Sequence, residues 1–146
     1  MEVHATMAYK QQVRSIFINL PVRELSVTRA FWSKLGFSFD EAYCDENAVC
    51  LVLKEGEIYA MLLREPFFQT FTTRPVADGS TTQVLMAIDV GSRERVLEIM
   101  ALALDNGATH YLQAEDHGWM YYDRFTDPDG HQWEISFVDE TAAPKT

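Results

Sequence analysis

The chain has 146 residues, 47% of them hydrophobic and 12% aromatic, which is enough to bury the core of one folded domain. Its 22 acidic and 12 basic side chains give a formal net charge of −10. A surface of that sign repels phosphate backbones and anionic lipid, so we expect neither nucleic acid nor membrane partners. No apolar run reaches the roughly 20 residues that span a bilayer, and residues 1–14 contain no signal-peptide core.

The residues at both ends of the chain show no periodicity typical of a helix or a strand. We expect residues 1–12 to form a flexible arm and residues 140–146 a frayed tail. Cys44 and Cys50 are too few for a disulfide framework, so they are expected to be free, mostly buried thiols in the reducing cytoplasm.

The first half of the domain, residues 13–71, starts with a strand at Val13 to Leu20, which we expect Pro21 to end. A helix follows from about Glu24, with an apolar stripe at helical spacing and Gly36 just past its end. Three short strands are then expected at Phe37 to Tyr43, Ala48 to Lys54 and Ile58 to Leu63, followed by a short helix at Glu65 to Phe71.

After a linker at residues 72–81, the same order returns in residues 82–139. A strand at Val84 to Val90 precedes a helix with Ser92 as its N-cap and Gly107 past its end. The stripe of this helix is Val96, Ile99, Met100, Ala103 and Leu104. Three more strands are expected at Thr109 to Ala114, Trp119 to Thr126 and Gln132 to Val138.

The chain is therefore two copies of one βαβββ unit, offset by about seventy residues. This order predicts an α+β fold in which two tandem βαβββ modules form a curved, cup-shaped mixed sheet, a half-barrel, with helices on its outer face. The concave face of such a sheet is a natural site for a small molecule.

The most distinctive local motif is Asp127-Pro128-Asp129-Gly130, a tight turn before a strand of alternating apolar and polar residues. Trp133 and its apolar neighbours share one face of that strand, and Glu134 lies on the other. With a three-residue bulged loop, Arg124 would lie opposite Glu134 and pair with it. A two-residue loop would instead bring Asp123 opposite Glu134, and facing carboxylates favour acid–base chemistry.

The sequence resembles the glyoxalase / bleomycin-resistance / extradiol dioxygenase family, also called the vicinal oxygen chelate superfamily. The resemblance covers residues 13–139 and rests on Phe17 to Leu25 (FINLPVREL), Ala30-Phe31-Trp32, Leu35-Gly36-Phe37 and Phe125 to Glu134 (FTDPDGHQWE). It implies a cup-shaped half-barrel and a homodimer. One such scaffold hosts many functions, so the resemblance does not name a reaction.

Metal-dependent members of this family bind one divalent ion through the first and last strands of each unit. Their ligand positions fall here on Phe17, Met61, Leu85 and Glu134, of which only Glu134 offers a suitable donor atom. A register two residues different would substitute Asn19, Tyr59 and Gln83, which are weak ligands. No cofactor is therefore predicted, and a divalent metal, with Glu134 as its ligand, is disfavoured.

We expect the cup to bind a small, largely apolar or aromatic molecule without a metal. Glu134 is the only candidate catalytic group, although a structural pair with Arg124 is favoured over that role. The alternatives are a metal-dependent lyase or isomerase of the glyoxalase type that uses Glu134, or an interaction module whose own side chains fill the cup. The side chains expected to contact the ligand are Phe17, Asn19, Tyr59, Met61, Leu85, Tyr122, Arg124 and Glu134.

Overall fold

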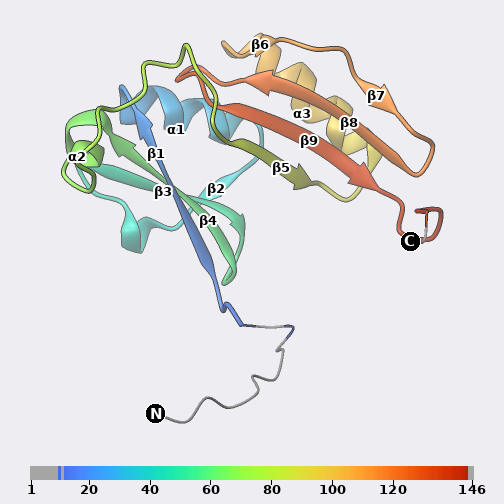
Figure 1. Cartoon of the computed structure of the whole chain (residues 1–146), viewed down its shortest axis with the longest axis horizontal. Helices are drawn as coiled ribbons and strands as arrows, with labels where there is room; N and C mark the ends of the chain where they lie inside the picture. Colours follow the sequence, from blue (N-terminus) through green and yellow to red (C-terminus); the bar gives the residue numbers. More distant parts are fainter. Residues whose placement is uncertain (1–9, 11, 145–146) are drawn as a thin grey trace, which may run out of the picture.

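The structure is a computed structural model that describes residues 10 and 12–144. The expected N-terminal arm, apart from Lys10 and Gln12, and the last two residues of the expected tail lie outside the described residues. The chain has the predicted α+β fold, with two βαβββ modules and curved mixed sheets (Figure 1). Within the described part of the chain, the helices are too short or too polar to cross a membrane.

The N-terminal module contains a four-stranded sheet in the order β1-β4-β3-β2, with β1 parallel to β4 and the other pairs antiparallel. Its elements are β1 (Ile16–Val22), α1 (Leu25–Lys34), β2 (Ser38–Phe39), the 3-10 turn η1 (Glu41–Tyr43), β3 (Ala48–Lys54), β4 (Ile58–Arg64) and α2 (Glu65–Gln69).

The C-terminal module repeats this arrangement, with the order β5-β9-β8-β6 and β7 also pairing with β8. The strand β5 is parallel to β9, and the other pairs are antiparallel. Its elements are β5 (Leu85–Asp89), α3 (Arg93–Asp105), β6 (Thr109–His110), β7 (Glu115–Asp116), β8 (Met120–Thr126) and β9 (Gln132–Val138). The predicted N-cap of α3 is confirmed, because the Ser92 hydroxyl accepts a hydrogen bond from the Arg95 backbone N–H at 3.1 Å.

Four sequence-based details are corrected by the structure. Pro21 does not end the first strand but lies inside β1, where an edge strand tolerates a residue without an N–H. Of the strand expected at Phe37 to Tyr43, only β2 forms, and η1 replaces the rest. The strand expected at Thr109 to Ala114 keeps only β6, and β7 begins after it. Leu104 is 43% exposed rather than part of the buried stripe of α3.

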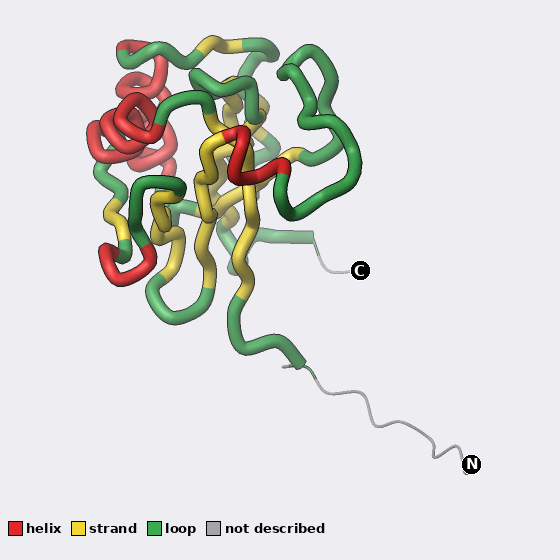
Figure 2. Tube along the Cα trace, turned by 90° about the vertical axis from the view of Figure 1, so that its left-hand side faces the viewer, coloured by secondary structure: helices red, strands yellow, loops and turns green. Residues whose placement is uncertain are grey.

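Among residues 10 and 12–144, no backbone pairing joins the sheets of the two modules, so β1 and β5 are both edge strands there. A cavity of about 950 Å³ is lined by Ile18 of β1, the whole of β5, Phe37 and residues of β3, β4, α3 and β9. The two sheets lie side by side in Figure 1, and Figure 2 shows the longer helices together on one side of the strands.

One continuous hydrophobic core nevertheless unites the modules on the helical side. Trp32 of α1 packs against Trp133 of β9 with ring centroids 4.7 Å apart, and Phe31 packs against Phe125 of β8 at 5.8 Å. Both tryptophans are fully buried. Because α1 belongs to the first module and both strands to the second, neither module completes its core alone.

The Asp-Pro-Asp-Gly turn fastens the second module to the end of β1. The Arg23 backbone N–H donates to Asp129 Oδ1 at 2.9 Å, and the Arg23 guanidinium contacts the Pro128 carbonyl. His131 Nε2 lies 2.7 Å from the Pro21 carbonyl oxygen. The motif that resembles the family signature is thus a polar link between the modules.

Candidate ligand-binding site

The four expected ligand contacts in the N-terminal module lie together on one face of its sheet. Strands β1 and β4 place Phe17 beside Tyr59 and Asn19 beside Met61. The Phe17 and Tyr59 rings stack with centroids 4.9 Å apart and planes 10° from parallel. Phe17 is still 45% exposed, so this stack offers aromatic surface to a ligand or a partner.

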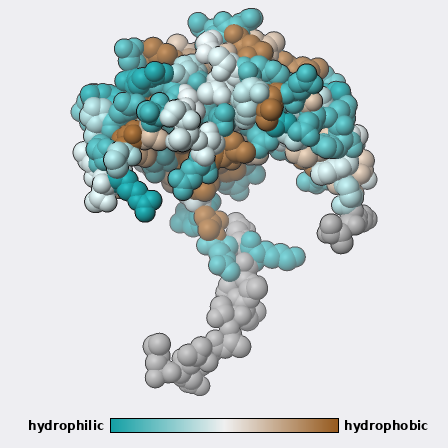
Figure 3. Space-filling view, turned by 45° about the horizontal axis from the view of Figure 1, so that its top comes forward, coloured by the Kyte–Doolittle hydropathy of each residue, from teal (hydrophilic) through white to brown (hydrophobic). Residues whose placement is uncertain are grey.

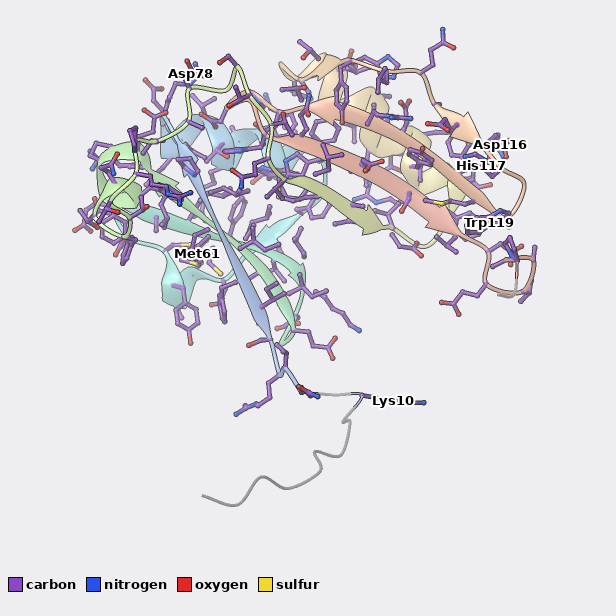
Figure 4. The ribbon with its side chains drawn as sticks, viewed as in Figure 1. Lys10, Met61, Asp78, Asp116, His117 and Trp119 are labelled. Carbon is purple, nitrogen blue, oxygen red and sulfur yellow. The ribbon has the colours of Figure 1, made fainter. Side chains whose placement is uncertain are left out.

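A cavity of about 620 Å³ opens at one end of this face. Its strand residues include Asn19, Met61 and Leu63, and Met61 is labelled in Figure 4. Its remaining wall comes from the segment around η1, the first residue of β3, and α2 with the residues after it: Tyr43, Asp45, Ala48, Phe67, Phe68, Phe71 and Thr72. The lining is therefore mainly aromatic and aliphatic.

The ligand contacts expected from the sequence did not include the three phenylalanines in and just after α2. The structure places Phe67, Phe68 and Phe71 along the cavity wall, and Phe67 and Phe71 form an edge-to-face pair with centroids 5.0 Å apart. Their helical spacing was visible in the sequence. What was not visible is that α2 contacts β1 and β4 on the side where Met61 lies.

The four expected contacts in the C-terminal module are also neighbours. Arg124 of β8 lies directly opposite Glu134 of β9, and Tyr122 precedes Arg124 on the same face. Ala87 of β5 lies beside Glu134 on its other side, and Leu85 is two residues earlier on β5. The register confirms the three-residue turn, with Gly130 at φ +92°, and excludes the alternative with Asp123 opposite Glu134.

The expected ion pair between Arg124 and Glu134 is wrong. The Arg124 guanidinium instead contacts the Glu115 carboxylate, and Tyr122 donates its hydroxyl to the same oxygen at 2.6 Å. The hydrogen bonds from Tyr122 and Arg124 hold the pKa of Glu115 below its usual range. Glu115 reaches Arg124 because β7 adds a strand at the outer edge of β8, a pairing that no local sequence pattern revealed.

Glu134 is half-buried, and its carboxylate makes no hydrogen bond or ion pair to any residue in the described part of the chain. Its charge, together with burial as the larger cause, raises the pKa of the Tyr111 hydroxyl, and Arg124 opposes this. Tyr111 therefore belongs to this polar group although sequence reasoning did not select it. The sequence around Tyr111 does not alternate regularly between apolar and polar residues, so it did not indicate which way this side chain points.

The donor set around Glu134 does not fit a divalent ion. Phe17, Met61 and Leu85 stand at the other positions that the resemblance implies, and no three His, Cys, Asp or Glu side chains converge among residues 10 and 12–144. His110 pairs with Asp123 at 2.7 Å and His117 with Glu115 at 3.3 Å. His4 lies outside the described residues.

The two cysteines are free thiols, as expected. Cys50 is fully buried, and burial, followed by the charges of Asp40 and Cys44, raises the pKa of its thiol. Cys44 is half-buried and accepts a hydrogen bond from the Cys50 backbone N–H at 3.4 Å. Neither thiol is held in the electropositive setting that activates a nucleophile.

The eight expected contacts thus form two groups of four, one on each sheet. Within the described part of the chain, no hydrogen bond joins the two groups. Figure 4 labels Met61 on the first module, and Asp116 and His117 near the far edge of the second. Whether all eight contact one ligand stays a prediction.

Comparisons with solved structures show that the chain has the fold of glyoxalase and bleomycin-resistance proteins. A hypothetical protein from S. aureus superimposes with a TM-score of 0.74 at 19% identity, over 88% of this chain and 97% of that one. A glyoxalase/bleomycin resistance protein/dioxygenase family enzyme from Burkholderia phytofirmans gives a TM-score of 0.68 at 19% identity, covering 84% and 96%. A bleomycin-binding protein in complex with bleomycin gives 0.58 at 18% identity, covering 86% and 98%.

These matches confirm, at the level of the fold, the family resemblance seen in the sequence. No protein-family model matches the sequence, and no curated protein matches it. At such identities the solved structures establish the architecture and leave the ligand open.

Proposed function

We propose that the protein binds a small, largely apolar or aromatic molecule on its concave sheet face without a metal ion. The observation that carries this proposal is the cavity of about 620 Å³ beside Met61. Its volume lies in the usual range for small-molecule sites, roughly 300–1,000 Å³, and its mainly apolar lining is also typical of them. The similarity to a bleomycin-binding protein supports a binding role rather than a particular ligand.

We also propose that two copies of the chain form a cytoplasmic homodimer. Large apolar side chains are exposed along the two unpaired edge strands and the residue before one of them: Ile16 (48%), Phe17 (45%), Val84 (58%) and Leu85 (53%). Exposed apolar side chains along unpaired strand edges are typical of sites where another chain binds. A second copy that covers these edges would also complete the wall around each group of expected ligand contacts.

Binding is tested by a thermal-shift screen of small aromatic compounds, followed by isothermal titration of the compounds that raise the melting temperature. Met61→Glu should abolish the response, because it places a charge in the apolar cavity. Leu97→Glu is the matched control, since Leu97 is exposed on α3 and does not line that cavity. A broad screen without any hit would favour the interaction module whose cup is filled by its own side chains.

Elemental analysis of protein purified without chelator tests the metal-free part of the proposal. One tightly bound divalent ion per chain would overturn it and favour the lyase or isomerase alternative with Glu134 as a ligand. Light scattering after size exclusion tests the dimer. Leu85→Asp should then shift the mass to that of one chain.

A further inference from the structure

The cavity beside Met61 has an aromatic wall built from two separate segments of the chain. Tyr43 ends η1, and Phe67, Phe68 and Phe71 lie in and just after α2. The Phe67 and Phe71 rings stand at 86° to each other with centroids 5.0 Å apart. Phe71 is 68% exposed, so its ring is not used up in the core. Because the face of an aromatic ring attracts positive charge, this wall favours a cationic ligand over an anionic one.

The charge in the lining of this cavity is negative. Asp45 lines it, whereas no Lys, Arg or His does so within the described part of the chain. Asp45 Oδ1 accepts from the backbone N–H groups of Asn47 at 2.8 Å and Ala48 at 3.0 Å, and Oδ2 accepts no hydrogen bond from the described residues. Arg64 follows the lining residues of β4 but does not line the cavity, and its guanidinium donates to Asn47 Oδ1 at 3.1 Å. The cavity therefore has a carboxylate that no basic lining residue matches.

The apolar part of the lining narrows the kind of cation. Ala48, Met61 and Leu63 add aliphatic and thioether side chains to the aromatic ones. An ammonium group with N–H bonds needs several acceptors when it leaves water. A quaternary ammonium group has no N–H bond and is covered by alkyl groups, so it can lie against apolar side chains and ring faces. A volume of about 620 Å³ also leaves room for an apolar body attached to that group.

We propose that the cavity beside Met61 selects an organic cation, a quaternary ammonium group attached to an aromatic or aliphatic body. The ring faces of the aromatic wall attract the cation, and Asp45 supplies the opposite charge. The formal net charge of −10 attracts a ligand of the same sign from a distance. The inference rests on the proposed binding function and adds the charge of the ligand.

Three probes that share a benzyl group test the selection: benzyltrimethylammonium, its neutral isostere neopentylbenzene, and the anion phenylmethanesulfonate. Each is titrated by NMR against the whole protein. The cation should bind about tenfold more tightly than the anion. Asp45→Asn should weaken the cation about twofold to fivefold and leave the hydrocarbon unchanged. Phe71→Leu keeps an apolar side chain but removes a ring face, so it should weaken the cation by a larger factor than the hydrocarbon.

The variants are chosen to keep the fold. Asparagine at position 45 retains the Oδ1 acceptor that both backbone N–H groups use. Glu46→Gln is the matched control, because it removes the same charge from the next residue, which is exposed and does not line the cavity. It should leave all three affinities unchanged. Met61→Glu, which should abolish the binding of uncharged aromatic compounds, should retain that of the cation.

Contrary results separate this inference from the proposed function. An anion that binds as tightly as the cation would overturn the charge selection, as would equal affinity of the cation for Asp45→Asn and the unchanged protein. If neopentylbenzene binds and the cation does not, the charge selection fails while the proposed function stands. If none of the three probes binds, both fail at this cavity.

Discussion

The indole Nε1 of Trp133 donates a hydrogen bond of 3.0 Å to Oδ2 of Asp127, and both side chains are buried. The other oxygen, Oδ1, accepts from the backbone N–H groups of Asp129 and His131 at 2.9 and 3.0 Å. One carboxylate thus fixes the turn, the start of β9 and the orientation of a core tryptophan. Burial raises the pKa of Asp127, while His131 and the three N–H donors oppose that shift.

Asp127→Asn should lower the free energy of unfolding by about 1–3 kcal/mol. Its amide nitrogen must face either the Trp133 indole N–H or the two backbone N–H groups, so a buried donor meets another donor. Urea denaturation measures the change. Asp105→Asn at the exposed end of α3 is the control, with an expected change within about 0.5 kcal/mol. Full stability of Asp127→Asn would show that Asp127 is already protonated in the folded protein.

Gly130→Ala should destabilise the protein more than Gly56→Ala does. Both glycines have positive φ, +92° and +81°, so alanine is strained at either position. A Cβ at position 130 would also lie 3.1 Å from the Cα of Gly79, whereas position 56 has no neighbouring atom within 4 Å. The difference between the urea unfolding midpoints of the two variants measures the effect of the contact between the turn and the linker. Equal midpoints would show that this contact does not affect stability.

Trp32→Ala should destabilise both modules together by about 3–5 kcal/mol, because it empties the place where α1 packs on β9. If the two modules share one core, tryptophan fluorescence and far-ultraviolet circular dichroism should report the same unfolding midpoint in the variant. Two separate transitions would show that the modules fold independently.

Acid should loosen the outer edge of β8. The pKa of Glu115 is lowered by hydrogen bonds from Tyr122 and Arg124, so the carboxylate stabilises the fold above its unfolded pKa. That contribution is lost as the pH falls from the ordinary glutamate range through the lowered value. Amide hydrogen exchange at Tyr121 and Tyr122, measured against pH, should therefore accelerate in acid relative to the core of β9. Glu115→Gln should reduce this pH dependence, and an unchanged profile would contradict the assigned partners.

The sequence predicted the parts of the site that depend on local periodicity. Alternation placed Phe17 and Asn19 on one face of β1, and the turn chemistry of Pro128 and Gly130 placed Arg124 opposite Glu134. Both placements depend only on residues that are near one another in the sequence.

The partner of Arg124 could not be predicted in the same way. Glu115 reaches Arg124 because the edge strand is interrupted between β6 and β7 by the bulge that contains Tyr111. The alternation of apolar and polar residues in such a short edge strand does not determine which residues of β8 it pairs with. The sequence predicted Asn19 and Met61 as ligand contacts but not the aromatic wall of the cavity beside them, because that wall depends on how α2 folds back over the sheet.

The unpaired edges of β1 and β5 carry a consequence for handling the protein. Among the residues that the structure describes, each has a row of backbone amide and carbonyl groups that no other strand pairs with, and exposed apolar side chains lie along it. Figure 3 shows hydrophobic patches among the hydrophilic surface. Such edges recruit strands from other chains when a protein opens. Heating should therefore end in aggregates whose formation quickens with concentration, and lysine at Val84, just before β5, should delay their onset without weakening the core.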